Sequence, residues 1–471
     1  MREWPNRTVS KTVVSQGTVG SNPTPSAFQG RPPLVGGVTG QRCCRPGDPF
    51  TGRHKTITER WVSHVPRTTA ATSGGATRGP LAGVKVLDLS MALTGPYAVA
   101  LLAAQGAEVV KVERPGIGDI ARWIGVSVNG MSAFYLACNR GKRCIAVDLG
   151  SHEGREIVMA LASAADVVVQ NFRPGVIDRL GLGYEAVRAL NPEVVYCSIS
   201  GYGPEGPYSH RSAYDTSIQA YAGFAANQAD PNGGPPTFLR QNAADKVSAL
   251  YASQAITAAL YARATGRGGQ HLEMGMADAC VSFLWAESAG NEVLLDSDGS
   301  RASSFIAGFQ PMRFLDGWGI VVPTTDADFA GMCKALDVEG FDDPRVATVA
   351  ERRKNRDVLE PIMDMCYAMA ANLTQDDATE RFERERVAFA MVLSTAEIVH
   401  DPHAQTIGMF TEFEHPVAGR ARLPRHPTNF HGTPAALGGL TPGLGEHTDE
   451  VLTELGLGDR IEELRSTGVI A

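Results

Sequence analysis

The chain lacks the sequence features that would assign it to a membrane, secreted or nucleic-acid-binding class. No run of about 18 apolar residues occurs, so no membrane-spanning helix is expected. Lys and Arg total 43 against 51 Asp and Glu, a net charge of -8, which argues against a basic nucleic-acid surface. The first residues contain no apolar stretch after their basic start, so a secretory signal is not expected either.

Paired cysteines are also missing. The eight cysteines form no CxxC motif, which excludes the usual zinc knuckle and redox pair. Cys138, Cys197 and Cys280 lie in apolar stretches and are interpreted as core residues of a protein in a reducing cytoplasm. No metal site is expected, because the acidic cluster at residues 446–450 is typical of a solvated helix start.

The common nucleotide and hydrolase motifs are absent as well. The turn after the first expected strand is LSMALTGP rather than GxGxxG, and no GxxxxGK[ST], GxSxG or HExxH occurs. A nicotinamide-dependent oxidoreductase remains an alternative enzyme class that the missing glycine motif disfavours.

Residues 1–79 differ in composition from the rest. They are rich in Gly, Pro, Ser, Thr and Arg without helical or strand periodicity, so we expect them to be disordered. The string GSNP within residues 19–27 (VGSNPTPSA) can be encoded by the T-arm consensus of a transfer-RNA gene. Two interpretations stay open: a flexible tail, or a reading frame opened too early. Mass spectrometry of the native N-terminus would decide between them.

From residue 80 onwards, apolar runs alternate with helical patterns. Residues 84–89 predict a strand, 97–104 a helix and 107–112 the next strand, which is a parallel, right-handed unit. Further strands are expected at 166–170, 193–199 and 271–274, and helices at 153–164, 245–265, 449–455 and 460–466. This alternation predicts an α/β fold with a Rossmann-like parallel sheet covered by helices on both faces.

A change in the sequence pattern near residue 300 predicts the domain organisation. We expect a large domain at residues 80–299, including a linker helix. A smaller α+β domain, with a strand at 319–322, is expected at 300–395. Residues 396–471, which carry many turn signals, are expected to return to the large domain.

Six segments carry a resemblance to the family III CoA-transferases, which include formyl-CoA:oxalate and carnitine CoA-transferases and the α-methylacyl-CoA racemases. They occur in order at residues 81–119, 139–148 (NRGKRCIAVD), 165–183, 191–207, 266–277 and 442–457 (PGLGEHTDEVLTELGL). Together they are specific for the family but not for the substrate. The resemblance implies a homodimer whose two chains interlock, and an activity that moves CoA from an acyl-CoA to a carboxylic acid. CoA then acts as a substrate thioester, and no permanently bound cofactor is implied.

The resemblance points to Asp245, in NAADKVSAL, as the nucleophile. Taken alone, an Asp at a helix start is more often an N-cap. An ionised carboxylate can, however, attack a thioester, and the helix start could favour the anion and hold an oxyanion. The spacing from Tyr214 is one residue longer than is usual in the family, an insertion that we place in the turn at residues 230–236.

Tyr214 bears on which reaction occurs. The racemases of the family have His at this position, and Tyr is a poor base at neutral pH. CoA transfer is therefore favoured over α-methylacyl-CoA epimerisation, which remains the alternative within the family. A CoA-binding protein without activity is the alternative outside it. Asp215 is interpreted as a local structural acid.

The resemblance also implies positions that contact CoA, whose phosphates call for cations and backbone N–H groups. They are Arg114, Val147, Asp148, Leu149, Asn171, Phe172, Arg173 and Arg179, with Phe172 expected against the adenine. In two places the chain departs from the family. Leu93 replaces a frequent Gln, which disfavours oxalate as substrate, and Gly150 replaces a common Lys. The lid candidate at residues 306–311 (IAGFQP) has one glycine instead of a glycine run.

Overall fold

The computed structural model describes residues 79–230, 233–298, 306, 309–435 and 438–471. Both interpretations of residues 1–79 therefore fall outside the described residues, apart from Gly79 itself, as do residues 307 and 308 of the lid candidate and residues 231 and 232 of the turn. All described residues belong to one compact unit, 55–471. Within them, every helix is too short or too polar to traverse a bilayer.

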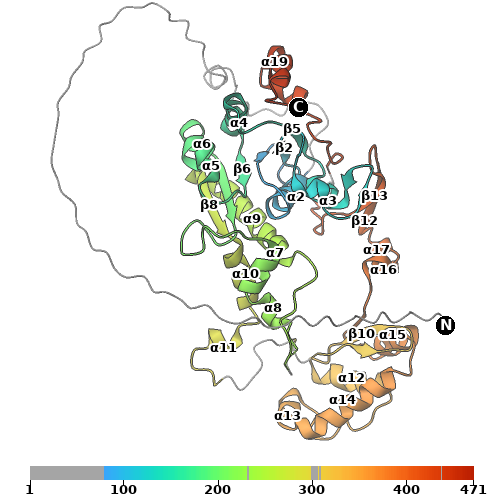
Figure 1. Cartoon of the computed structure of the whole chain (residues 1–471). Coiled ribbons are helices and arrows are strands. Elements are labelled where there is room, and N and C mark those ends of the chain that lie inside the picture. Colours follow the sequence, from blue (N-terminus) through green and yellow to red (C-terminus); the bar gives the residue numbers. More distant parts are fainter. Residues whose placement is uncertain (1–78, 231–232, 299–305, 307–308, 436–437) are drawn as a thin grey trace, which may run out of the picture. The chain divides into compact units, whose positions relative to one another are not determined.

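A six-stranded parallel sheet, with strand order β5-β2-β1-β6-β7-β8, forms the centre of the fold (Figure 1). Its register places Leu87 opposite Val110 on one side and Val168 on the other. The predicted parallel α/β sheet is confirmed, although β5 was not predicted as a strand. The six strands are β1 (Lys85–Asp88), β2 (Glu108–Glu113), β5 (Arg143–Ala146), β6 (Val167–Gln170), β7 (Val195–Ser200) and β8 (Gln270–Gly275).

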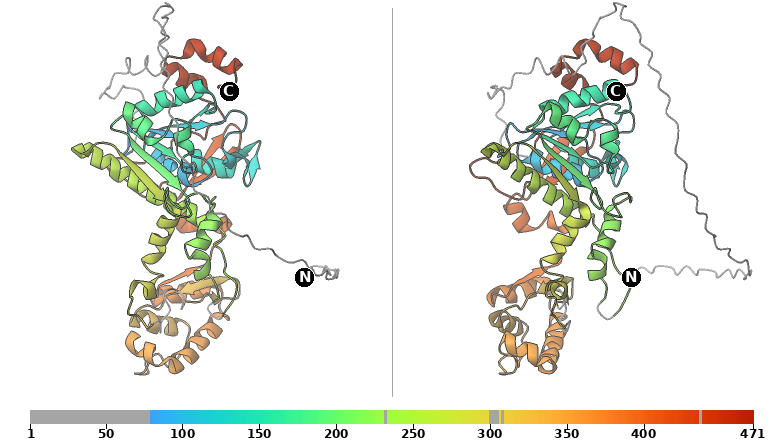
Figure 2. Two further views of the ribbon diagram at one scale, coloured as in Figure 1. Left: turned by 60° about the vertical axis from the view of Figure 1, so that its left-hand side comes forward. Right: turned by 90° about the vertical axis from the view of Figure 1, so that its left-hand side faces the viewer.

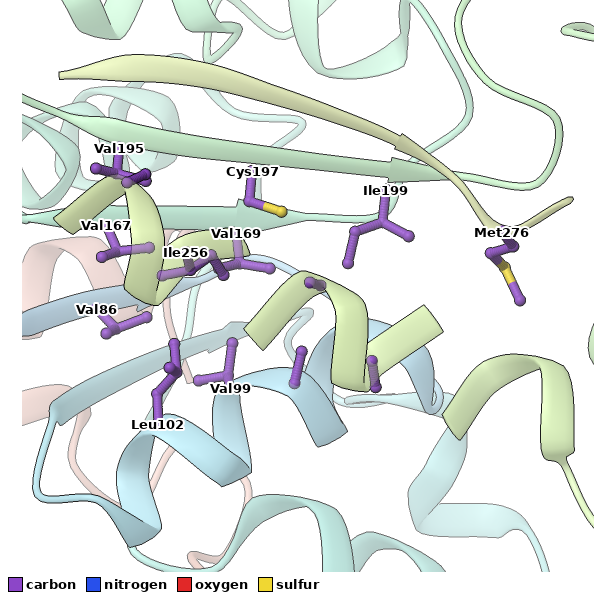
Figure 3. Close-up of a cluster of buried hydrophobic side chains, with 14 of the residues drawn as sticks. Val86, Val99, Leu102, Val167, Val169, Val195, Cys197, Ile199, Ile256 and Met276 are labelled. Atoms are coloured by element: carbon purple, nitrogen blue, oxygen red, sulfur yellow. The ribbon is translucent and has the colours of Figure 1, made fainter. Parts of the chain in front are cut away.

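Alternate residues of these strands enter two separate cores, because successive side chains of a strand point to opposite faces. Val86, Val167 and Val195 belong to one core, and Figure 3 shows them facing Val99 and Ile256. This face packs against α2 (Thr94–Ala104), α9 (Ala243–Ala262) and α10 (Met276–Trp285). The sheet is thus covered by helices on both faces, as the alternation predicts (Figure 2).

The opposite face carries Leu87, Val168 and Tyr196. It packs against α4 (His152–Ala164), α6 (Tyr184–Leu190), α18 (Thr448–Glu454) and α19 (Ile461–Ser466). The end of the chain joins it directly, since Ala471 N donates to Ala146 O at 3.2 Å. The predicted C-terminal helices are therefore part of the core around the large sheet.

A third core draws only on residues 312–391. It joins a three-stranded antiparallel sheet to α12, α14 and α15, and α13 directly precedes α14 along the chain; all four helices and β10 are labelled in Figure 1. The strands are β9 (Met312–Arg313), β10 (Trp318–Val321) and β11 (Phe389–Met391), and the helices are α12 (Asp326–Ala335), α13 (Val349–Lys354), α14 (Arg356–Ala370) and α15 (Gln375–Arg384).

A hairpin of β12 (Phe410–His415) and β13 (Gly419–Pro424) was not predicted, because prolines and glycines made this stretch resemble a series of turns. Glu412 binds Arg420 and Arg422 across the two strands, and such cross-strand pairs stabilise a hairpin. The shorter elements are η1 (Ile120–Trp123), β3 (Ser127–Val128), β4 (Met131–Ser132), α3 (Ala133–Asn139), α5 (Val176–Arg179), α7 (Asp215–Tyr221), α8 (Phe224–Asn227), η2 (Arg263–Arg267), α11 (Gly290–Val293), α16 (Thr395–Ile398), α17 (Pro402–Thr406) and η4 (Gly458–Arg460).

Candidate active site

A cavity of about 240 Å³ opens at the carboxyl edge of the large sheet. The chain runs from β1 outwards to β2 and β5, and then returns to the other side of β1 with β6, so the strand order reverses between β1 and β6. Parallel α/β sheets bind their ligands at such a point. The cavity is lined by the end of β2, residues 111–113, and by the segments after these four strands, among them Ser90 and Met91, Arg114, residues 147–150, and Phe172.

Five of the eight predicted CoA contacts line this cavity. They are Arg114, Val147, Asp148, Leu149 and Phe172. The other three follow β6 but do not line it. Asn171 bonds to the main chain of Met91, whereas Arg173 and Arg179 are exposed. The cavity is consistent with the predicted position of CoA, while the roles of the individual residues stay predictions.

The segment between β5 and α4 has a fixed shape. Asp148 Oδ1 accepts the N–H of Gly150 at 2.9 Å, and Ser151 Oγ accepts the N–H of Gly154 at 3.0 Å, which caps α4. A Cβ atom at Gly154 would lie 2.1 Å from Asp148 O, so only glycine fits there. This wall of the cavity is rigid, and Gly150 contributes no positive charge to it.

Four charged side chains form a buried network beside the cavity. Lys142 Nζ lies 2.8 Å from Asp88 Oδ2, and Lys111 Nζ lies 2.9 Å from Asp119 Oδ2. Burial raises the pKa of Asp88, but the two lysines outweigh it, and the net result is a lowered pKa. Sequence reasoning missed this network. The signal was present, because Asp88 directly follows two apolar residues of β1 and Lys111 lies between Val110 and Val112 in β2.

The loop of residues 90–94 follows β1 and is held through its main chain. Asn171 donates to Met91 O at 2.8 Å and accepts from Met91 N at 2.9 Å. Asp119 Oδ1 accepts the N–H of Ala92 at 2.8 Å. Ala92 has φ of 66°, a left-handed conformation that costs free energy for a residue with a side chain. These contacts impose one conformation on the loop.

Asp245 is the third residue of α9 and is half-buried. The helix begins after Asn242, so the interpretation of Asp245 as a plain N-cap is wrong. Its Oδ1 accepts a hydrogen bond from the Thr94 hydroxyl, and its backbone N–H donates to Asp215 Oδ2 at 3.0 Å. Asp245 does not line the cavity, but the loop that carries Thr94 does.

The surroundings of Asp245 shift the pKa of its carboxyl group towards neutral pH. Burial raises its pKa to about 6, and the nearby charge of Asp215 adds to this rise. The hydrogen bond from Thr94 and the charge of Lys246 oppose it. At pH 7 the carboxyl group is about 90% ionised for a pKa of about 6. Asp245 can therefore act as a nucleophile near neutral pH.

Two observations bear on the expected roles of the helix start and of Tyr214. The backbone N–H of Asp245 is bound to Asp215, so this one N–H of the helix start is not available to hold an oxyanion. Tyr214 is 76% exposed, and the hydrogen-bond partners of Asp245 are Thr94, Asp215 and Asn242. Asp215 is buried and also accepts from Gln219 Nε2 at 2.5 Å, which fits the structural role predicted for it.

A parallel α/β sheet with a cavity at its switch point, and a carboxylate of raised pKa next to the lining loop, are features typical of an enzyme. Residues 81–448 match the model of CoA-transferase family III. The human succinyl-CoA:glutarate CoA-transferase is 33% identical over 404 residues, covering 83% of this chain and 90% of that protein. The succinate–glutarate CoA-transferase of Agrobacterium fabrum is also 33% identical, over 387 residues, covering 80% and 96%.

A crystal structure of a CAIB/BAIF family protein from Brucella suis is 32% identical, with a TM-score of 0.70, and covers 80% of this chain and 100% of that chain. The chain belongs to CoA-transferase family III. It is an enzyme that transfers CoA from an acyl-CoA to a carboxylic acid, which confirms the predicted family and reaction class.

Proposed function

We propose that this enzyme transfers CoA from succinyl-CoA to a dicarboxylic acid of about the size of glutarate, with Asp245 as the nucleophile. The observation that carries the proposal is the half-buried Asp245, joined through Thr94 to the loop that lines the cavity. The choice of substrates is supported by the human and Agrobacterium fabrum relatives, which are named for succinyl-CoA or succinate and for glutarate.

The character of Leu93 supports an acceptor larger than oxalate. Leu93 is buried and directly precedes Thr94, the residue that contacts Asp245. Members of the family that use oxalate have a Gln near the substrate, and Leu93 occupies the corresponding position in this chain. An apolar side chain there offers no hydrogen bond to a short dicarboxylate.

The proposed reaction is a sequence of acyl exchanges at the Asp245 carboxylate. The Asp245 carboxylate attacks the succinyl-CoA carbonyl, the C–S bond breaks, and CoA leaves as thiolate, which produces a mixed anhydride of Asp245 and succinate. The thiolate attacks the aspartyl carbonyl, which releases succinate and leaves an aspartyl-CoA thioester. The acceptor carboxylate attacks this thioester and expels CoA, which then attacks the acceptor carbonyl and regenerates Asp245. Each step exchanges one activated acyl group for another, as covalent catalysis requires.

The cavity is the proposed CoA site. Arg114, exposed at its edge, would pair with a phosphate through its planar fork, and Phe172 would pack against the adenine. Val147, Asp148 and Leu149 would contact CoA through the rigid segment before α4, whose N-terminus favours an anion. We propose outer contacts for Asn171, Arg173 and Arg179, and for Tyr214 a hydrogen bond to a substrate carboxylate.

We also propose that the enzyme is an interlocked homodimer. Large apolar side chains are exposed on two neighbouring helices, namely Leu250 (54%) and Tyr261 (73%) on α9 and Phe283 (54%) on α10. Exposed apolar groups of this kind favour a protein partner. The proposed domains are 80–299, 300–395 and 396–471, in accord with the separate core of residues 312–391. The buried free cysteines support a reducing, cytoplasmic location.

A panel of acceptors tests the substrate proposal. Purified enzyme with succinyl-CoA and equal concentrations of glutarate, oxalate or propanoate is expected to form glutaryl-CoA at least about ten-fold faster than oxalyl-CoA, as measured by mass spectrometry. A ten-fold ratio corresponds to about 1.4 kcal/mol, within what one apolar contact contributes. Faster transfer to oxalate would contradict the role of Leu93. No transfer from succinyl-CoA to any acceptor would contradict the proposed donor.

The rate is expected to rise with pH through about 6. Only ionised Asp245 attacks the thioester, so its raised pKa places the acid limb near that value. The rate of the first half-reaction, enzyme plus succinyl-CoA without acceptor, is expected to fall about ten-fold between pH 7 and pH 5. Quench-flow kinetics of succinate release would measure this rate. Because no acceptor is present, the ionisation of an acceptor acid cannot contribute to the pH dependence. A limb near pH 4 would contradict the perturbed carboxyl group.

A further inference from the structure

Thr94 is placed to act on the nucleophile from a different helix. It is the first residue of α2 and is only 3% exposed, while Asp245 lies 151 positions later, in the first turn of α9. Its hydroxyl donates to Asp245 Oδ1 and lies 3.8 Å from Met276 Sδ. A hydrogen bond from a buried hydroxyl is much more stabilising when its acceptor is an ionised carboxylate than when its acceptor is a thioether sulfur. The carboxylate is therefore its main partner.

The backbone that carries Thr94 has little freedom. The preceding loop is held at Met91 by Asn171 and at Ala92 by Asp119. Gly95 closes the turn, since a Cβ atom there would lie 2.3 Å from the Ser90 Cβ. A β-branched side chain on a fixed backbone has few χ1 choices. The direction of the Thr94 hydroxyl is thus set by the same loop that lines the cavity.

The Asp245 carboxylate is oriented from two sides. Asp215 holds the backbone N–H of Asp245, which fixes the start of α9. Thr94 binds Oδ1, so Oδ2 is the oxygen that Thr94 leaves unbound, and the Asn242 side chain is a further hydrogen-bond partner of the carboxyl group. Nucleophilic attack requires a narrow range of approach directions. A side chain that prevents rotation of the carboxylate therefore increases the fraction of time that the carboxylate spends in a reactive orientation.

We propose that Thr94 is a positioning residue for CoA transfer, whose hydroxyl holds the Asp245 carboxylate so that Oδ2 faces the thioester carbonyl. The proposal rests on the proposed role of Asp245 as nucleophile. It deepens that role by linking the nucleophile to the CoA cavity through residues 90–94. A loss of the hydroxyl affects the orientation of Asp245 and also the stability of its ionised form.

Thr94→Val tests the proposal, because it keeps the shape and removes the hydroxyl. We expect kcat to fall on the order of ten- to one hundred-fold, the usual effect of removing a hydrogen bond to a charged group. The KM for succinyl-CoA is expected to stay within about two-fold, since Thr94 does not line the cavity. The acid limb is expected to move to higher pH, because the hydrogen bond favours the ionised carboxyl.

Two companion variants separate the hydroxyl from packing. Thr94→Ser restores the hydroxyl and is expected to recover most of kcat and the original acid limb. Thr257→Val on the same helix as Asp245 removes a hydroxyl that donates only to Ser253 O at 2.9 Å, and it is expected to leave both unchanged. Wild-type kcat and pH profile in Thr94→Val would overturn the proposal. So would a Thr94→Ser enzyme as slow as Thr94→Val.

Labelling of Asp245 separates the two ideas. Hydroxylamine added during turnover converts an aspartyl thioester or anhydride to a hydroxamate, which peptide mass mapping locates. An unlabelled Asp245 in the wild type would overturn the nucleophile and, with it, this proposal. A labelled Asp245 with an unaffected Thr94→Val would overturn only the role of Thr94. If Thr94→Val does not fold, equal kcat in Thr94→Ala and Thr94→Ser would overturn it as well.

Discussion

Replacing Asp245 with Ala is expected to abolish CoA transfer, with kcat falling at least about 10³-fold, as is usual when a covalent nucleophile is removed. The physical reason is that the substitution removes the carboxylate on which the proposed anhydride forms. Asp215, the nearest carboxylate in the hydrogen-bond network, is buried and already accepts from the backbone of Asp245 and from Gln219. Conversion of succinyl-CoA and glutarate to glutaryl-CoA measures the loss.

Chemical labelling shows whether the loss of activity in Asp245→Ala comes from the loss of a covalent nucleophile. Wild-type enzyme quenched with hydroxylamine during turnover is expected to carry the hydroxamate at Asp245, whereas Asp245→Ala is expected to carry none anywhere. Asp364→Ala, which removes an exposed carboxylate on α14, is the matched control and is expected to keep full activity. Transfer at the wild-type rate in Asp245→Ala would refute the mechanism, and a hydroxamate at another carboxylate would reassign the nucleophile.

The large sheet was predictable because its strands are short apolar runs separated by helical patterns. The unit of β1, α2 and β2 follows directly from residues 84–112, and parallel pairing follows from the intervening helix. β5 and the β12–β13 hairpin were missed because local signals conflicted there. Residues 143–146 lie inside a charged motif, and the hairpin contains the turn formers Pro416 and Gly419. Their pairing depends on neighbours distant in the sequence.

The site was predictable only in part, for the same reason. Five of the CoA contacts that the family resemblance implies line the cavity, although three of them, residues 147–149, follow β5, a strand that was not predicted. The partners of Asp245 could not be derived from sequence. Thr94 lies 151 positions away from Asp245, and nothing in its local pattern distinguishes it from an ordinary first residue of a helix. The buried network of two lysines and two aspartates was indicated in the sequence only by Asp88 and Lys111, which adjoin apolar residues of β1 and β2.

Lys142→Met is expected to destabilise the protein by about 3–5 kcal/mol, the usual cost of leaving one charge of a buried ion pair without its partner. Lys142 Nζ donates to Asp88 Oδ2 at 2.8 Å, to Pro96 O at 2.9 Å and to Asn139 Oδ1 at 3.0 Å. Without it, the cation that remains beside Asp88 among the described residues is Lys111, whose Nζ lies 3.9 Å from Asp88 Oδ2. Urea denaturation of both proteins at pH 7.5 gives the difference in unfolding free energy.

An exposed ion pair provides the contrast. Lys354 Nζ lies 2.7 Å from Glu351 Oε1 on the surface of α13, where water and salt screen the charges. Lys354→Met is therefore expected to change the unfolding free energy far less than Lys142→Met does. Equal effects of the two substitutions would show that burial of the Asp88–Lys142 pair does not matter to stability.

The destabilisation caused by Lys142→Met is expected to depend on pH, because it depends on the ionisation of Asp88. In the wild type the lysines hold the pKa of Asp88 below its ordinary value, so the ionised form stabilises the fold above that ordinary value and this contribution is lost as pH falls through the lowered pKa. In Lys142→Met burial dominates and the pKa of Asp88 rises, so protonation at acid pH relieves the unpaired charge. The stability difference from wild type is therefore expected to narrow from pH 7.5 towards pH 4.

A double variant, Asp88→Asn with Lys142→Met, removes both charges and is expected to recover much of the lost stability. Its activity tests a separate point. Asp88 Oδ1 accepts from Ser90 N at 3.0 Å, and Ser90 lines the cavity at the start of the loop that leads to Thr94. Asn keeps an acceptor for this bond. Recovered stability with recovered activity would assign the ion pair to folding, whereas recovered stability with a raised KM for succinyl-CoA would show that its charge also shapes the cavity.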